Sequence, residues 1–152
     1  MGDDLKYQWY YKSAGSSKYK KASCTKSSYT ITMTEDRKDR KFYCIITDKY
    51  GNEVKTKTVT MKMAASITTE PKSEIVKNGS KAKITVKAVG DGLTYQWYYK
   101  DPGSSKYKKS SNAKATCTAE MKSSRNGRKV YCIVEDKYGN AVKSKTVSMK
   151  KK

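Results

Sequence analysis

The sequence contains no histidine, and its 34 Lys and Arg residues are matched by only 14 Asp and Glu residues. Without histidine, the commonest general base and the commonest metal ligand are both missing, and no two cysteines are spaced closely enough for a metal pair. No glycine-rich phosphate loop or nucleophile elbow is present. No stretch approaches the ~20 apolar residues of a membrane span. The first residues lack the apolar run of a signal peptide, so we expect either an internal start or the edge of a cloned fragment. The sequence predicts no enzyme, no metal site and no cofactor.

The residues that are abundant are basic or aromatic. The formal net charge is +20, and charge of that size attracts polyanions such as nucleic acid, cell-wall polymers and acidic glycans. Lysines on the wet faces and edges of β-sheets also prevent aggregation, so solubility explains the same charge. Thirteen tyrosines stand against one phenylalanine. Tyrosine suits strands with one dry and one wet face, because its ring can be half-buried while its hydroxyl stays in water.

The sequence repeats itself without a gap at an offset of 88 residues, the separation of Trp9 and Trp97. Residues 3–62 align with 91–150, and more than half of the positions are identical. The strings YQWYYK, GSSKYKK and YCI followed by DKYGN occur in both copies. Glu35, Asp36 and Asp39 form a cluster of acids, but their counterparts are Ser or Gly, which argues against a catalytic carboxylate pair.

Residues 65–90 have no counterpart before the first copy. Their ITVKAV string alternates apolar and polar residues after an Asn78-Gly79 turn, so it predicts a strand over 82–89. No segment has a helical period. We therefore expect an all-β chain with two tandem units. Residues 1–64 form a partial unit without its opening strands, and 65–152 form a complete one of the size of a β-sandwich domain.

The strand carrying Trp9, the Tyr-Thr-Ile-Thr-Met strand over 29–33, and Tyr43-Cys44 before the TDKYGN turn resemble strands C, E and F–G of an immunoglobulin fold. More narrowly, the chain resembles the bacterial immunoglobulin-like repeats of large Gram-positive gut surface proteins. The resemblance implies an immunoglobulin-like β-sandwich in an extracellular or cell-surface protein that adheres, displays or spaces. It also implies that Trp9 and Trp97 are core residues rather than ligand platforms.

The four cysteines do not match the usual bridge between strands B and F that this resemblance implies. Cys44 and Cys132 occupy the strand-F position, but strand B offers only Ile84, Val86 and Ala88 on its inward face. Cys117, on strand E, faces strand F across the core, so a Cys117–Cys132 disulfide is geometrically plausible, and two small buried hydrophobic residues are the alternative. A Cys24–Cys44 bridge needs a local rearrangement.

Several tyrosines and lysines are candidate ligand contacts. By alternation Tyr10 and Tyr98 face away from the core, and the GSSKYKK hairpin places another tyrosine in a basic cluster beside each of them. Aromatic rings among cations can stack on sugars or bases and pair with anions, whereas a solvated lysine rim is the structural alternative. The F–G turn exposes one more tyrosine per copy. The candidates are Tyr10, Tyr19, Lys20, Lys21, Tyr50, Tyr98, Tyr107, Lys108, Lys109 and Tyr138.

Three functions stay open at this point: adhesion to or recognition of a host protein (including an immunoglobulin) or a glycan, spacing within a surface stalk, and electrostatic binding of an anionic polymer. The partial unit adds an expectation of its own. A sandwich without two strands exposes an apolar face and a bare edge. Three outcomes stay open: residues 65–90 are shared or swapped, a neighbouring chain completes the first unit, or the sequence starts within a domain that packs imperfectly. Of these we expect self-association through the first unit.

Overall fold

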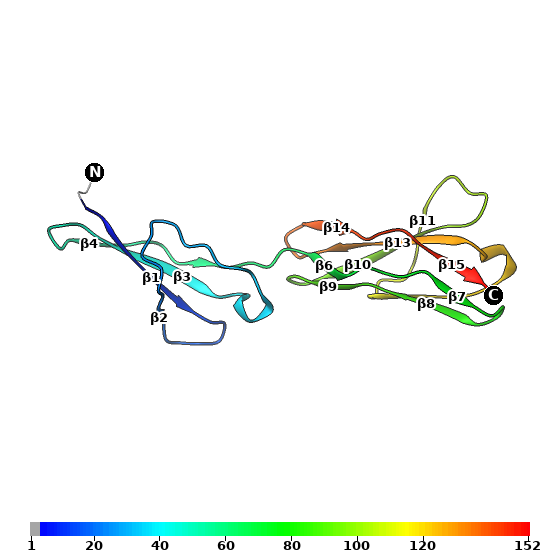
Figure 1. Ribbon diagram of the computed structural model, residues 1–152, viewed down its shortest axis with the longest axis horizontal. Helices are drawn as coiled ribbons and strands as arrows, with labels where there is room; N and C mark the ends of the chain where they lie inside the picture. The colour runs from blue at the N-terminus through cyan, green and yellow to red at the C-terminus, as the bar shows by residue number, and fades with distance from the viewer. Residues whose placement is uncertain (1–3) are drawn as a thin grey trace. The chain divides into compact units, whose positions relative to one another are not determined.

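The computed structural model describes residues 4–152 and forms two compact units, one ending at Met63 and the other spanning Ala64–Lys152. Both units are built from strands and turns (Figure 1). The first contains β1 (Lys6–Lys12), β2 (Lys20–Lys21), the 3₁₀ turn η1 (Glu35–Arg37), β3 (Lys41–Thr47), β4 (Glu53–Lys55) and β5 (Val59–Thr60). Among the described residues, no helix is long and apolar enough to cross a membrane.

The second unit is a two-layer sandwich. Its strands are β6 (Ser66–Thr69), β7 (Glu74–Val76), β8 (Lys81–Thr85), β9 (Lys87–Val89), β10 (Thr94–Lys100), β11 (Lys108–Lys109), β12 (Thr116–Glu120), β13 (Arg128–Glu135), β14 (Ala141–Lys143) and β15 (Val147–Lys151), with the turn η2 (Ser123–Arg125). One sheet has the order β11-β10-β13-β15-β7, with β14 also paired to β13. The other layer contains the pairs β12-β8 and β6-β9. The prediction of an all-β, immunoglobulin-like sandwich is confirmed.

The core of the second unit follows from the alternation of its strands. In β8 and the residue after it, Ala82, Ile84 and Val86 are buried while Lys83 and Thr85 between them are exposed. They pack in one cluster with Trp97 and Cys132 of the facing sheet. The segment 64–90 forms its ladders inside this unit, where β6 pairs with β9, β7 with β15 and β8 with β12. The predicted strand swap is therefore not supported.

The first unit contains a single sheet, of order β2-β1-β3-β4, with β5 also paired to β3. Residues 29–33, predicted as a strand, are not a strand in the structure. The reason is the missing partner: the equivalent segment of the second unit, β12, is a strand because it pairs with β8 over five residues. Without a counterpart of β8 among residues 4–63, segment 29–33 has no ladder to join.

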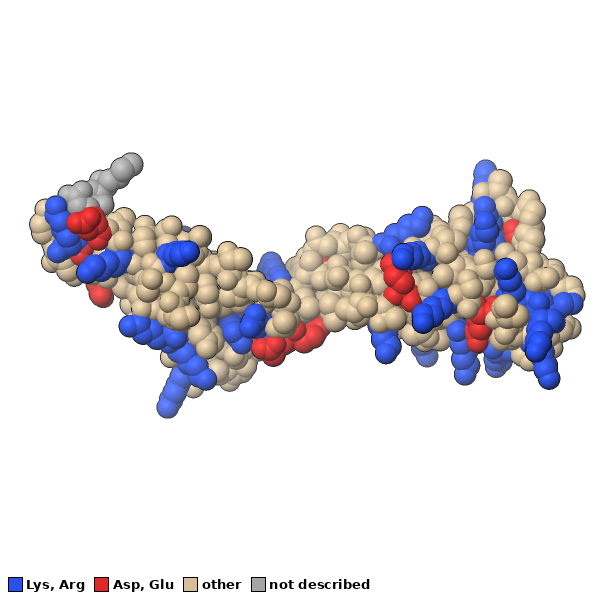
Figure 2. Space-filling view, in the orientation of Figure 1, with Lys and Arg blue, Asp and Glu red and all other residues tan. Residues whose placement is uncertain are grey.

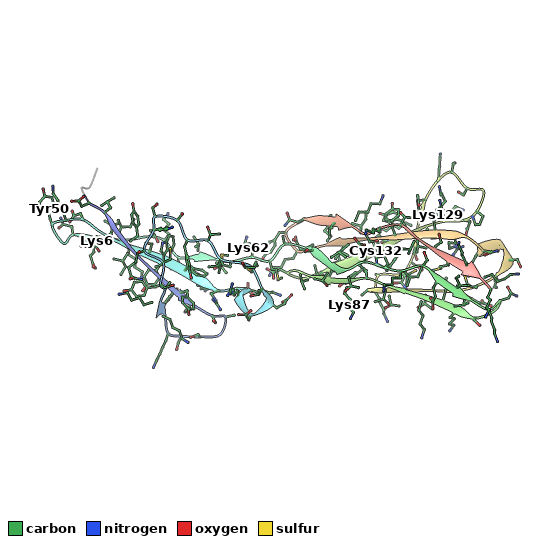
Figure 3. All side chains as sticks on the ribbon, in the orientation of Figure 1. Lys6, Tyr50, Lys62, Lys87, Lys129 and Cys132 are labelled. Carbon is green, nitrogen blue, oxygen red and sulfur yellow. The ribbon has the colours of Figure 1, made fainter. Side chains whose placement is uncertain are left out.

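The predicted disulfides are absent, because Cys24, Cys44, Cys117 and Cys132 are all free thiols. Cys117 and Cys132 are buried in the apolar core of the second unit. Burial raises the pKa of both thiols, that of Cys132 to about 12. Both residues pack as small core hydrophobes, the alternative weighed above. The thiol of Cys24 donates to the carbonyl of Ser28 over 3.4 Å. Figure 3 shows Cys132 within its unit.

A candidate recognition face of tyrosines and lysines

Strand alternation and register place two tyrosines side by side on the outer surface of each main sheet. Trp9 is directed toward the core side of β1, so Tyr10 is directed outward. The register then puts Tyr10 opposite Tyr43 of β3, and Tyr98 opposite Tyr131 of β13. In both units the two rings stack with centroids 5.1 Å apart and planes 14° apart.

The hairpin after β1 adds a third tyrosine to the cluster. Tyr19 meets Tyr43 edge-on at 4.7 Å and 65°, and Tyr107 meets Tyr131 at 4.9 Å and 64°. The hairpin is fastened at its base, because the side-chain amide of Gln8 donates to the carbonyl of Ala22 over 2.8 Å. Gln96 makes the equivalent bond to Ser110 over 2.8 Å. A hydrogen bond from the glutamine side chain to the backbone thus holds the hairpin that carries the third tyrosine.

Lysines complete the cluster. The ammonium of Lys55 lies 4.0 Å from the ring centroid of Tyr43, and that of Lys12 lies 5.1 Å from Tyr19. In the second unit Lys143 lies 4.1 Å from Tyr131, and Lys100 lies 5.2 Å from Tyr107. These are cation–π distances. Within the described chain, none of the four ammonium groups has a carboxylate partner, so each keeps its capacity to pair with an anion.

We call this surface the tyrosine face. It comprises Tyr10, Tyr19 and Tyr43 with Lys12 and Lys55 in the first unit, and Tyr98, Tyr107 and Tyr131 with Lys100 and Lys143 in the second. Burial raises the pKa of Tyr43, and the neighbouring Tyr10 and Tyr19 raise it further. The pKa of Tyr131 is raised in the same way, by burial and then by the neighbouring Tyr98 and Tyr107. The central hydroxyls are therefore neutral hydrogen-bond donors at neutral pH. The face can stack on a flat ring and pair with an anionic group at once.

The structure brings only some of the predicted contact residues together. Tyr10, Tyr19, Tyr98 and Tyr107 all belong to the tyrosine face. Lys21 and Lys109 pair in register with Tyr10 and Tyr98, and cross-strand partners point to the same side of a sheet. Lys20 and Lys108 alternate to the other side. Figure 2 shows basic side chains over both units, with few acidic ones among them in this view.

The two tyrosines of the F–G turns do not join the cluster. Tyr50 is 75% exposed and lies at the tip of its turn in Figure 3. Tyr138 is 38% exposed, because its hydroxyl donates to the carboxylate of buried Asp91 over 2.8 Å. The hydroxyl of Tyr138 therefore has a structural role in the second unit, while Tyr50 lies apart from the other candidates.

Sequence reasoning missed the centre of the face. Tyr43 and Tyr131 were interpreted only as neighbours of a core cysteine, and Lys55 and Lys143 were not singled out. The signal was present, since a tyrosine directly before a buried strand residue must point outward. The described residues hold no group of three or more His, Cys, Asp or Glu side chains suited to a metal ion.

Comparisons with known proteins define the fold only. No protein-family model and no curated protein matches the sequence. Among solved structures, the four N-terminal Ig domains of Dscam1 isoform 4.44 match with a TM-score of 0.54 at 16% identity, over 97% of this chain and 38% of that one. DIP-gamma IG1+IG2 matches with a TM-score of 0.52 at 16% identity, over 97% and 83%. The FN1–FN3 domains of chicken CNTN1 match with a TM-score of 0.53 at 13% identity, over 96% and 57%. The chain thus spans well under half the length of the Dscam1 fragment, and the likeness supports an immunoglobulin-like architecture.

Proposed function

We propose that this chain is a non-catalytic extracellular recognition module that binds an acidic glycan through the tyrosine face of each unit. The observation that carries the proposal is the reproduction of one cluster in both units, with ring spacings that agree within 0.2 Å. The two units bury their cores differently, so core packing alone does not require this agreement on the outer surface.

The chemistry of the face supports an acidic glycan as the ligand. Rings stacked on a sheet offer a rigid apolar surface at a small entropic cost. The lysines beside them, without carboxylate partners, supply cations for carboxylate or sulfate groups. A sugar ring bearing such groups uses both components, whereas a simple anion uses only the lysines. Two faces on one chain also allow bivalent attachment to a surface that displays many copies of the ligand.

The test uses heparin oligosaccharides as a sulfated glycan and inorganic polyphosphate as an anion without sugar rings. We compare a variant carrying Lys55→Ala and Lys143→Ala, whose ammonium groups lie over Tyr43 and Tyr131, with a control carrying Lys57→Ala and Lys145→Ala. The control removes the same charge from lysines that make no cation–π contact among the described residues. The first variant is expected to bind heparin about tenfold more weakly, the size of a lost cation contact of about 1.4 kcal/mol. The control is expected to lose much less.

Salt dependence separates recognition from general charge attraction. Polyphosphate binding should collapse as salt rises, because counterion release dominates it. Part of the heparin binding should resist high salt. The double change Tyr43→Ala and Tyr131→Ala should remove that part. Equal losses in the two lysine variants would assign the binding to net charge. Absence of binding to any glycan would favour the spacer.

A further inference from the structure

The second unit contains a polar pocket at the edge of its sandwich. The pocket has a volume of about 510 Å³ and lies between β10 and β11 of one sheet and β12 of the other. Trp97, Val130 and Met149 border it from the core and are at most 1% exposed, so the wall that a ligand can reach is polar. The side chains of that wall belong to Tyr99, Ser111, Thr118, Glu120, Arg125 and Arg128.

Arg128 is held in place at this pocket by two contacts. By alternation it lies on the same side of β13 as the buried Val130 and Cys132, facing the other layer. Its Nε donates to the carboxylate of Asp101 over 2.6 Å, and its guanidinium lies 4.4 Å from the ring centroid of Tyr99. Within the described chain, no hydrogen bond engages its two Nη atoms. Their N–H groups therefore keep the capacity to donate to a ligand.

Arg125 supplies a second guanidinium from the η2 turn. Its Nη1 donates to the carbonyl of Glu120 over 2.8 Å, which anchors the side chain and leaves its other N–H groups without a partner among the described residues. Two forked cations at one pocket can hold a carboxylate or a phosphate by paired hydrogen bonds. The carboxylate of Glu120, which pairs with Lys122 at 3.5 Å, adds a negative charge to the same wall. That charge favours a singly charged carboxylate over a doubly charged phosphate.

The hydroxyl groups of the wall favour a ligand that carries hydroxyls of its own. Tyr99, Ser111 and Thr118 each present a side-chain hydroxyl that makes no hydrogen bond within the described chain. A volume of about 510 Å³ lies in the usual range of small-molecule sites, about 300–1,000 Å³, and is larger than a lone anion needs. A carboxylate on a hydroxyl-bearing ring uses both the arginines and the hydroxyls.

We propose that this pocket, the arginine pocket, binds the carboxylate-bearing ring of a sugar acid such as a uronic acid. Arg125 and Arg128 hold the carboxylate, and the hydroxyls of the wall bond to the hydroxyls of the ring. The pocket borders the tyrosine face at Tyr98, but Arg128 lies on the inner side of the sheet. The proposal therefore does not rest on ligand binding by the tyrosine face.

The first unit repeats the polar part of the wall. Eight residues of the first unit line a pocket, and their counterparts at the offset of 88 all line the arginine pocket. Three of the eight differ, since Ala22, Tyr29 and Ile31 replace Ser110, Cys117 and Ala119. The residues that supply the ring, one hydroxyl and both guanidinium groups are identical: Tyr11, Ser23, Arg37 and Arg40 correspond to Tyr99, Ser111, Arg125 and Arg128. The test uses the second unit because its core is closed.

The test titrates the full chain with glucuronic acid and follows the amide NMR signals, which separate the two units. We expect shifts over residues 118–128. Glucose, which lacks the carboxylate, and acetate, which lacks the ring, should each bind about tenfold more weakly. Arg125→Gln should weaken glucuronic acid binding about tenfold, and Arg125→Lys should also weaken it because the forked donor is lost. The control Lys129→Gln removes the same charge from the other side of β13 and should change the affinity less than about twofold.

Several results would overturn the proposal. Equal losses in Arg125→Gln and Lys129→Gln would assign the binding to net charge, and inorganic phosphate that binds as tightly as glucuronic acid would leave an unspecific anion pocket. N-acetyl-aspartate amide that binds as tightly would reassign the pocket to an acidic peptide. Absence of shifts over residues 118–128 would exclude the site. The double variant Tyr43→Ala and Tyr131→Ala should keep glucuronic acid binding, so failure of the tyrosine face and failure of the arginine pocket are told apart.

Discussion

The two units share most of their sequence, yet only the second has a closed core. In the second unit β8 and β6 cover the sheet, and Trp97 is completely buried. In the first, the equivalent tryptophan remains half-buried although its indole N–H donates to the same carbonyl position, Lys26 at 2.9 Å against Lys114 at 2.8 Å. Local hydrogen bonds therefore form without the covering layer, whereas burial depends on it. Four predictions test this difference, from the largest expected effect to the smallest.

The largest difference should come from the paired tryptophans. Trp97→Ala empties a closed core and should cost about 3–5 kcal/mol, whereas Trp9→Ala removes a side chain already partly in water and should cost about 2 kcal/mol. Denaturant unfolding followed by hydrogen exchange, which resolves the amides of β3 and β13, measures both. Equal costs would show that the first unit is closed in solution.

The next prediction concerns a half-buried arginine present in both units. Arg128 lies 4.4 Å from the ring of Tyr99 and pairs with Asp101 at 2.6 Å. Arg40 lies in the same way over Tyr11, at 4.9 Å, but Ser13 replaces the aspartate. Its Nε is buried without a hydrogen-bond partner, while an Nη atom reaches Asp36 at 3.6 Å.

Transferring the aspartate between units should shift their stabilities in opposite directions. Asp101→Ser should destabilise the second unit by about 2 kcal/mol, because Arg128 is left without its partner. Ser13→Asp should stabilise the first unit by about 1 kcal/mol, since this pair is partly exposed. Unfolding at low and high salt is the measurement. A Ser13→Asp variant no more stable than the parent would mean that Asp36 already satisfies Arg40.

Acid should affect the second unit more than the first. Burial alone would raise the pKa of Asp136, but hydrogen bonds from Asn140, Ala65 and Tyr138 outweigh it and lower the pKa to about 2. Hydrogen bonds from Asn52 also lower the pKa of Asp48, its counterpart. A lowered pKa stabilises the fold above the unfolded value of about 4, and this contribution is lost as pH falls toward 2.

We therefore expect unfolding in urea at pH 6, 4 and 2.5 to show a decline in stability below pH 4. The decline should be steeper for the second unit, because the backbone N–H of Ala65 donates to Asp136 over 2.9 Å. Asp136→Asn should lower stability at pH 6 and flatten the pH dependence. An Asp136→Asn variant whose stability depends on pH as the parent's does would show that Asp136 does not cause the decline.

The smallest expected effect should be equal in the two units. In both units the backbone N–H of the strand-F cysteine donates to a hydroxyl. Cys44 donates to Thr56 and Cys132 donates to Ser144, each over 2.9 Å. Thr56→Val and Ser144→Ala should each cost about 1 kcal/mol, the usual net value of one hydrogen bond. A much larger cost in the second unit would show that even this local bond depends on the closed core.

The sequence indicated the fold through features that act locally. Alternation around Trp97 and the Asn78-Gly79 turn predicted the strands, and the offset of 88 residues predicted the two units. The strand predicted over 29–33 does not form, because a strand needs a partner strand. No local pattern of that segment shows whether the partner is present. The predicted disulfides are absent because strand positions allowed either a bridge or two buried thiols at Cys117 and Cys132, and the structure has the thiols.

The candidate site was predicted only in part, for a similar reason. Tyr10, Tyr19 and their counterparts were found from alternation and from the basic hairpin. Tyr43 was missed because its role depends on cross-strand register, which places it between two rings from another part of the chain. Lys55 depends on the same register, since it pairs opposite Ile45 next to Tyr43.

The hydrogen bonds that fasten the hairpin of each unit have one more consequence. Gln8 and Gln96 each donate to two carbonyls, one in the strand and one beyond the hairpin, with no help from the opposite layer. The hairpin that carries Tyr19 or Tyr107 is thus attached from within its own sheet. Substitutions in the covering layer should therefore leave this attachment in place.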